Sequence, residues 1–311
     1  MSASELCRYT VIHYKPNKAV NLVVGAIYIA WAIAFAVHQF RWRSRSAPGW
    51  RWGWVLPGGC IFSGIGYFIR PQIDPCDFKL GTFIGQQMLI ILSPCFFIAF
   101  NYAIFGRAIT ATREPRLSWI APDKVSKIFV WSDVITFWIQ GGAGGLQAKQ
   151  GPLQVWGSRI FLVGVGLQAL SYCVFTSLVV TAHARASVGR CRSMSQSQLG
   201  ADAVRRLRHL FWAFHVTNAF YLVRCTYRVL EYAFGNDSIL MKSEGWLIGL
   251  DAAPILLALA VWILRYPIAT VCLINDGHQE NPLETVKMLP EDASAENVNY
   301  YSSKHVSRDL A

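Results

Sequence analysis

The stretch at residues 82–105, TFIGQQMLIILSPCFFIAFNYAIF, contains no charged side chain. Its length matches the roughly 20 helical residues that are needed to cross a hydrocarbon core of about 30 Å. Backbone groups without hydrogen-bond partners are costly in lipid, so a segment of this kind crosses the bilayer as a helix. The stretch therefore predicts a transmembrane helix.

Six further stretches have the same character. The seven together occupy residues 20–40, 52–69, 82–105, 128–146, 160–181, 210–233 and 246–264. Hydrophobic residues make up 53% of the chain and charged residues 15%, whereas soluble domains have about a quarter charged residues. We expect an all-α integral membrane protein in which residues 20–274 form a domain of seven transmembrane helices. The first stretch is too long for a cleaved signal sequence and is expected to stay in the mature protein.

The distribution of positive charge predicts the orientation. With the N-terminus outside, the outer segments carry eight Lys and Arg residues, and the cytoplasmic loops and tail carry nineteen. The positive-inside rule then places residues 1–19 outside the cell and the C-terminus in the cytosol. The sequon at Asn236 falls in an outer loop, which makes this residue a glycosylation candidate.

Most of the net charge of +11 comes from short cytoplasmic loops, such as the one that holds Arg185, Arg190 and Arg192. Loops of this kind lie against the anionic inner leaflet. We interpret the charge as a topology signal and a contact with anionic lipids, and not as a nucleic-acid site. Residues 275–311 contain more acidic than basic residues and few apolar ones, which predicts a disordered cytosolic tail.

Two of the eight cysteines, Cys7 and Cys76, fall on the oxidising side of this topology. A disulfide between them would tie the N-terminal segment to the outer loop that follows the second stretch. Two free thiols are the alternative. The cysteines inside the apolar stretches are expected to pack as small apolar residues.

Charged residues near the outer ends of the apolar stretches are the first candidates for function, because a charge in hydrocarbon is costly and is usually paired or functional. The expected cluster comprises Arg70, Arg224, Arg228, Glu231, Glu244 and Asp251. Arg224, Arg228 and Glu231 are spaced four and three residues apart, so they share one face of a helix. Glu244 and Asp251 are two turns apart and are also expected to share a face.

The depths of these residues connect the last two helices. At a rise of 1.5 Å per residue, Arg224 and Asp251 both lie about 8 to 12 Å below the outer surface. Arg228 is then expected to approach Glu244 and Glu231 nearer the rim. The cluster is interpreted either as a substrate-binding site or as ion pairs that clamp the helices together.

A second set of polar residues, Gln87, Asp133, Gln140 and Gln168, suggests a polar relay through the membrane. Asp133 is a candidate proton-relay acid, and the alternative is a carboxylate that hydrogen-bonds to neighbouring helices. The glycines that follow Gln140 are expected to allow close packing or a hinge. They do not resemble a nucleotide-binding loop in context, because no strand precedes them.

An ordered series of residues resembles a known family. The series comprises Tyr14-x-Pro16 with Asn21, Gly66-Tyr67-x-x-Arg70, Gln87 with Pro94, Tyr102, Gly106-Arg107, Ser132-Asp133, Gln140 with its glycines, Gly166-x-Gln168, Arg224-x-x-Tyr227-Arg228-x-x-Glu231, Gly235, and Glu244 seven residues before Asp251. Over about residues 14–270 the chain resembles the fungal RTA-like proteins, the aminocholesterol-resistance or lipid-translocating exporter family. It departs from the family pattern at Asn17, Ser243 and Ile248, where Ser, His and Tyr are usual.

The resemblance implies a seven-span protein of the plasma membrane or an endomembrane that releases or flips sphingoid long-chain bases and gives tolerance to sterol-like toxicants. The residues are compatible with that function. A cationic amphiphile needs a carboxylate for its amine, which Glu231, Glu244 or Asp251 offers, and an apolar groove for its chain. No ATP-binding motif is visible in the sequence and no cofactor or metal is expected, which leaves passive, gradient-coupled or receptor-like action open.

Two other functional classes fit the same span count. A lipid or stress receptor without transport is the main alternative, although the Asp-Arg-Tyr and Asn-Pro-x-x-Tyr signatures of G-protein-coupled receptors are missing. An intramembrane lipid hydrolase needs about three His or Asp ligands for zinc. Only His38 and His215 lie within the apolar stretches, so we do not expect an enzyme.

The predicted topology is testable with glycosylation tags in an Asn236→Gln background, where the native sequon does not contribute. A tag at the N-terminus is expected to be modified in intact microsomes, and a tag after Leu264 is expected to stay unmodified. Endoglycosidase-sensitive gel mobility measures both. Modification of the tag after Leu264 would reverse the orientation.

Overall fold

A computed structural model of the chain describes residues 16–42, 50–73, 80–112, 115–147, 152–187, 201–234, 240, 243–268 and 270–271. Within these residues every regular element is helical. Several features expected from the sequence lie outside the described residues. They are the disulfide candidates Cys7 and Cys76, the sequon at Asn236 and the tail at residues 275–311.

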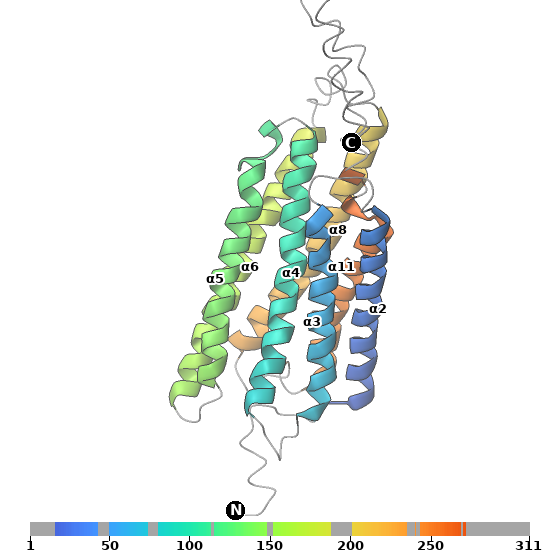
Figure 1. Cartoon of the computed structure of the whole chain (residues 1–311). Helices are drawn as coiled ribbons and strands as arrows, with labels where there is room; N and C mark the ends of the chain where they lie inside the picture. The colour runs from blue at the N-terminus through green and yellow to red at the C-terminus, as the bar shows by residue number, and fades with distance from the viewer. Residues whose placement is uncertain are drawn as a thin grey trace, which may run out of the picture.

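The described chain runs alternately up and down through one bundle (Figure 1). The long segments are α2 (Lys18–Trp42), α3 (Val55–Ile69), α4 (Leu80–Ala111), α5 (Pro122–Gln147), α6 (Pro152–Ser187), α8 (Ala201–Ala233) and a composite helix of α10 (Glu244–Leu247), the π-helical turn η6 (Ile248–Ala252) and α11 (Ala253–Leu264). Short 3₁₀ turns lie at η3 (Trp50–Trp54), η4 (Arg70–Gln72) and η5 (Pro115–Leu117). Six of these segments contain a predicted apolar stretch in full and extend beyond it on at least one side, and α3 begins three residues after the start of the stretch at residues 52–69.

Five of the segments are long and apolar enough to cross a membrane. They are Lys18–Arg41, Arg51–Gln72, Gly81–Ala111, Pro152–Ser187 and Glu244–Leu264. The helices α5 and α8 have the length but are more polar, because they carry buried residues such as Asp133, Gln140 and Arg228. The structure therefore supports an all-helical, multi-pass membrane protein.

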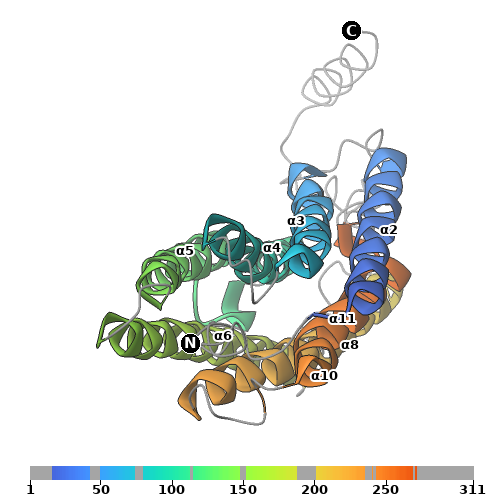
Figure 2. The ribbon, with the colours of Figure 1, turned by 90° about the horizontal axis from the view of Figure 1, so that it is seen from below.

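Seen along the helix axes, the bundle has two rows (Figure 2). One row holds α2, α3, α4 and α5, and the other holds α6, α8, α10 and α11. Helix α11 packs against both α8 and α2. Large apolar side chains such as Trp131, Trp138 and Leu170 are exposed on the outside of the bundle, as expected for faces that contact lipid.

Aromatic side chains fill the centre of the bundle. Tyr102, Phe129 and Phe175 contact one another from α4, α5 and α6. Phe214 on α8 packs edge-on against Trp262 on α11. Contacts of this geometry contribute beyond the burial of apolar area, so the aromatic residues fix how the two rows of helices pack.

Gly106 lies where α4 passes close to the start of α5. A Cβ atom added at Gly106 would lie 2.6 Å from the backbone oxygen of Pro122. We expect Gly106→Ala to destabilise the fold by about 1 to 3 kcal/mol, as overpacking does, and to lower the thermal midpoint in detergent. In the control Gly142→Ala, the added Cβ meets nothing within 4 Å, so the midpoint should not fall. Equal midpoints for the two variants would contradict this close approach.

Candidate functional site

A pocket opens at the end of the bundle where α2 begins, the lower end in Figure 1. It contains about 110 Å³ of free space. The polar residues that line it are Arg70, Gln86, Gln87, Gln140, Gln147, Gln154, Ser158, Arg228 and Glu231. Apolar residues complete the lining, among them Phe83, Ile91 and Phe161.

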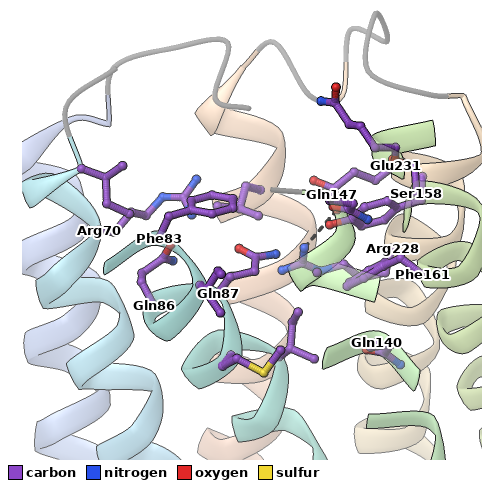
Figure 3. Close-up of a pocket in the computed structure, with 18 of the residues that line it drawn as sticks. Arg70, Phe83, Gln86, Gln87, Gln140, Gln147, Ser158, Phe161, Arg228 and Glu231 are labelled. Atoms are coloured by element: carbon purple, nitrogen blue, oxygen red, sulfur yellow. Dashed lines mark hydrogen bonds and ion pairs between the residues drawn. The ribbon is translucent and has the colours of Figure 1, made fainter. Parts of the chain in front are cut away.

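Helical spacing brings these side chains together. Phe83, Gln87 and Ile91 follow one another at intervals of four on α4, and Gln140 and Gln147 are two turns apart on α5. Figure 3 shows Gln87 and Arg228 within the pocket and Gln140 deeper in the bundle. A few polar groups in a partly apolar cavity are typical of a site that binds and orients a small ligand.

A buried charge network adjoins the pocket. Arg228 binds Asp251 with two hydrogen bonds, from Nε to Oδ1 at 2.8 Å and from Nη2 to Oδ2 at 2.7 Å. Its third nitrogen, Nη1, donates to Glu231 Oε2 at 3.0 Å. Arg224 adds an ion pair, with Nε 3.1 Å from Asp251 Oδ1. All four side chains are buried, so two arginines share the carboxylate of Asp251.

The backbone at Asp251 is a π-helical turn, Ile248–Ala252, between α10 and α11. Pro254 follows two residues later and has no N–H to donate to the preceding turn. Single π turns often occur at functional sites, because they widen the helix and change the direction of one side chain. Here the turn carries the Asp251 carboxylate that contacts α8.

Glu244 belongs to a separate outer group. Its Oε2 accepts a hydrogen bond from the backbone N–H of Asn17 at 2.8 Å, and its Oε1 accepts one from Asn21 Nδ2 at 2.7 Å. Arg70 Nε lies 3.6 Å from the same Oε1. The Asn17 side chain also accepts from the N–H of Ala19, which is the arrangement of an N-cap. Glu244 thus connects the start of α2 with the start of the last helix.

The sequence predicted a single cluster of six charged residues. The structure divides it into the buried charge network and this outer group. Arg224 and Asp251 meet at the same depth, as their positions indicated. Arg228 was expected near Glu244 but binds Asp251 instead. The reason is that Glu244 faces α2, whereas Asp251 on the π turn faces α8, so the two acids contact different helices.

The predicted polar relay is only partly brought together. Gln140 Nε2 donates to Gln168 Oε1 at 3.0 Å, and Gln168 Nε2 donates to the Cys95 sulfur at 3.4 Å. Gln87 lines the pocket. Asp133 lies apart from them, near the middle of α5, and neither of its carboxylate oxygens has a well-aligned hydrogen-bond partner in the described part of the chain.

Sequence reasoning missed a second buried network. Tyr172 donates to Asn218 Oδ1 at 2.6 Å, and Trp262 Nε1 donates to Asn101 Oδ1 at 3.0 Å. Asn101 Nδ2 approaches both Tyr172 and Asn218. Asn101 and Asn218 carry amide side chains within apolar stretches. Their presence there could have indicated a contact between α4 and α8.

Two histidines also meet, which the sequence did not indicate because His183 follows the fifth apolar stretch. His183 Nδ1 lies 2.7 Å from His215 Nε2, between α6 and α8. Among the described residues, no group of three His, Cys, Asp or Glu side chains is arranged to hold a metal ion. The zinc ligands that an intramembrane hydrolase needs therefore have no candidate in this part of the chain.

The fold and the site define a multi-pass helical membrane protein with a polar pocket beside a buried charge network. The model of the family "RTA1 like protein" matches residues 56–273. The chain belongs to the RTA1-like family, which confirms the resemblance found in the sequence. No solved structure matches the chain.

Three relatives from Saccharomyces cerevisiae show the range of names in the family. Protein RTM1 is 25% identical over 66% of this chain and 64% of its own length. Protoporphyrin uptake protein 1 is 22% identical over 81% of this chain and 90% of that protein. Sphingoid long-chain base transporter RSB1 of strain Lalvin EC1118 is 23% identical over 81% of this chain and 72% of that protein. The chain thus spans less than two thirds of RTM1.

The shared carboxylate predicts an asymmetry between two substitutions. Asp251→Asn leaves Arg224 and Arg228 facing each other in a low-dielectric site and should cost about 3 to 5 kcal/mol. Arg224→Met removes one buried ion pair but leaves Arg228 on Asp251, and should cost less, about 1.5 to 3 kcal/mol. Thermal midpoints in detergent measure both.

The control for this comparison is Arg159→Met, because Arg159 is exposed beside Trp156 and belongs to neither group. Exchanging the charges at positions 224 and 251 should not restore stability, since an arginine at 251 would face Arg228. Full recovery in that double variant would mean that Arg224 and Asp251 form an isolated pair.

Proposed function

We propose that this protein crosses the membrane seven times and moves single-chain amphiphiles, such as sphingoid long-chain bases, between the leaflets. The N-terminus lies outside, and the protein resides in the plasma membrane or an endomembrane. Membership of the RTA1-like family and the name of RSB1 support a lipid substrate. The pocket beside the charge network is the observation that carries the proposal.

The lengths of α5 and α8 support seven spans. Their 26 and 33 residues correspond to about 39 and 50 Å of helix, more than the hydrocarbon core requires. In their central parts Gln140 on α5 and Arg228 on α8 are buried and bind side chains of other helices, whereas the exposed charges, such as Lys124 and Arg205, lie nearer the helix ends. With this topology the pocket lies in the outer half of the membrane.

The pocket suits the polar headgroup of an amphiphile and not its chain. A space of 110 Å³ holds several water molecules, since each needs about 10 to 15 Å³ on this measure. The alkyl chain therefore stays outside the pocket, against the apolar surface that faces lipid. Separating the two parts of the substrate in this way avoids dragging a charged headgroup through hydrocarbon.

Glu231 is the carboxylate placed to receive an amine. It lines the pocket, and its donors are Tyr227 at 3.2 Å and Arg228 at 3.0 Å. Asp251 holds Arg228 through two hydrogen bonds. Arg228 can thus release Glu231 to an incoming ammonium group without losing its own counter-ion, which makes exchange of partners feasible at low cost.

Two leucine substitutions on adjacent glycines test the pocket. Gly144 lines the pocket, with Met88 3.9 Å from an added Cβ, so Gly144→Leu should fill the space without a clash. Gly145→Leu is the matched control, because an added Cβ there meets nothing within 4 Å. The measurement is leaflet transfer of a fluorescent sphingoid base in liposomes.

The parent and Gly145→Leu proteins should transfer the lipid faster than protein-free vesicles do, and Gly144→Leu should lose most of this activity. Saturable binding without transfer in the parent protein would favour a lipid sensor over a transporter. Equal transfer by the two leucine variants would place the headgroup site elsewhere.

A further inference from the structure

Asp133 is a buried acid that the pocket and the charge network do not use. Its exposed fraction is 3%, and it lies near the middle of α5. Both carboxylate oxygens are buried without a well-aligned hydrogen-bond partner among the described residues. The Tyr102 hydroxyl lies beside it and likewise lacks a well-aligned partner.

The titratable groups near Asp133 do not compensate a negative charge. They are Cys95 and Tyr102 on α4, Tyr172 on α6 and Cys225 on α8. None of these side chains carries a positive charge. The ion pairs found within the described residues all belong to Glu231, Glu244 and Asp251.

The other buried acids show what an ionised carboxylate needs in this bundle. Asp251 has two arginines, and Glu231 has Arg228 and the Tyr227 hydroxyl. An ionised Asp133 would have the Tyr102 hydroxyl beside it but no arginine, and would cost more in the protein interior. A proton removes that cost, because the neutral acid needs only ordinary hydrogen bonds.

A small cavity adjoins the pocket and shares Gln140 and Arg228 with its lining, and Asp133 is not among the residues that line it. The cavity has about 10 Å³ of free space, which is close to the volume that one water molecule needs. Gln140, Gln168, Arg224 and Cys225 are among its lining residues. Gln140 also lines the pocket, and Cys225 is among the titratable groups near Asp133. Asp133 lies seven residues from Gln140 on α5, or about 10 Å along the helix.

We propose that Asp133 is a proton-binding site, and that its proton exchanges for a cationic amphiphile during transport. The coupling rests on the proposed function, whereas the proton binding does not. In each cycle Asp133 takes up one proton from the pocket side as one cationic headgroup leaves to that side, and it releases this proton to the opposite side as the next headgroup enters. One positive charge replaces another, so no net charge has to cross the bundle.

The experiment compares the parent protein with Asp133→Asn, which has the shape of the protonated acid but cannot release a proton. Asp123→Asn is the control, since Asp123 is exposed in the first turn of the same helix. The substrate is a fluorescent N,N,N-trimethyl sphingoid base, whose charge does not change with pH. Protein-free vesicles give the background.

With the pocket side more acidic by one pH unit, the parent and Asp123→Asn should raise the amount of lipid in that leaflet by up to about tenfold, the ratio that this gradient can supply. Asp133→Asn should still transfer the lipid at equal pH but show no response to the gradient. If the parent transfers lipid but ignores the gradient, the coupling is wrong and the proposed function stands.

Infrared spectroscopy tests the proton directly, whether or not lipid moves. The C=O stretch of a protonated carboxylic acid should be present in the parent protein and missing in Asp133→Asn. If Asp133→Asn does not fold, Asp133→Glu should shift this band. A spectrum that is the same in the parent and in the substituted protein would overturn the proton-binding site.

Discussion

The arrangement of the bundle depends on the carboxylate of Asp251, which two arginines share. In a medium of low dielectric constant, a buried charge that loses its partner costs several kcal/mol. Asp251 on the π turn therefore fixes α11 against α8, because Arg224 and Arg228 lie one turn apart on α8 and both reach it. The same contact holds Arg228 at the wall of the pocket, where it also meets Glu231. The position of α11 against α8 and the shape of the pocket wall thus depend on the same interaction.

The composite helix of α10, η6 and α11 is anchored twice, once before its π turn and once within it. Glu244 holds its first residues to Asn17 and Asn21 on the first helix, and Asp251 holds its middle to α8. The π turn, which contains the second anchor, lets the two acids face different helices. An uninterrupted α-helix would place residues seven apart on one face, and one of the two sets of contacts would then be lost.

Much of the helix pattern followed from hydropathy, because an apolar run of membrane length has few other stable structures. The equal depth of Arg224 and Asp251 also followed, since it needs only the rise per residue. Three features did not. The π turn depends on local backbone hydrogen bonding, the contact between Arg228 and Asp251 depends on that turn, and the approach of Asn101 to Asn218 depends on how α4 and α8 pack. Periodicity along one helix contains no information about such contacts between helices.

The charges of the site also limit how a cation can pass. The three arginines of the cluster match its three acids, and each of these acids already accepts hydrogen bonds or an ion pair. Arg70, Arg228 and Glu231 are the members of the cluster that line the pocket, so a cationic headgroup that enters adds a charge beside two arginines and one acid in a region of low dielectric constant. That charge is tolerated only if an acid becomes free to pair with it or if another positive charge leaves. Glu231 meets the first condition within the pocket. Asp133 is the buried acid in the described part of the bundle that has no base of its own, so it is the group able to meet the second.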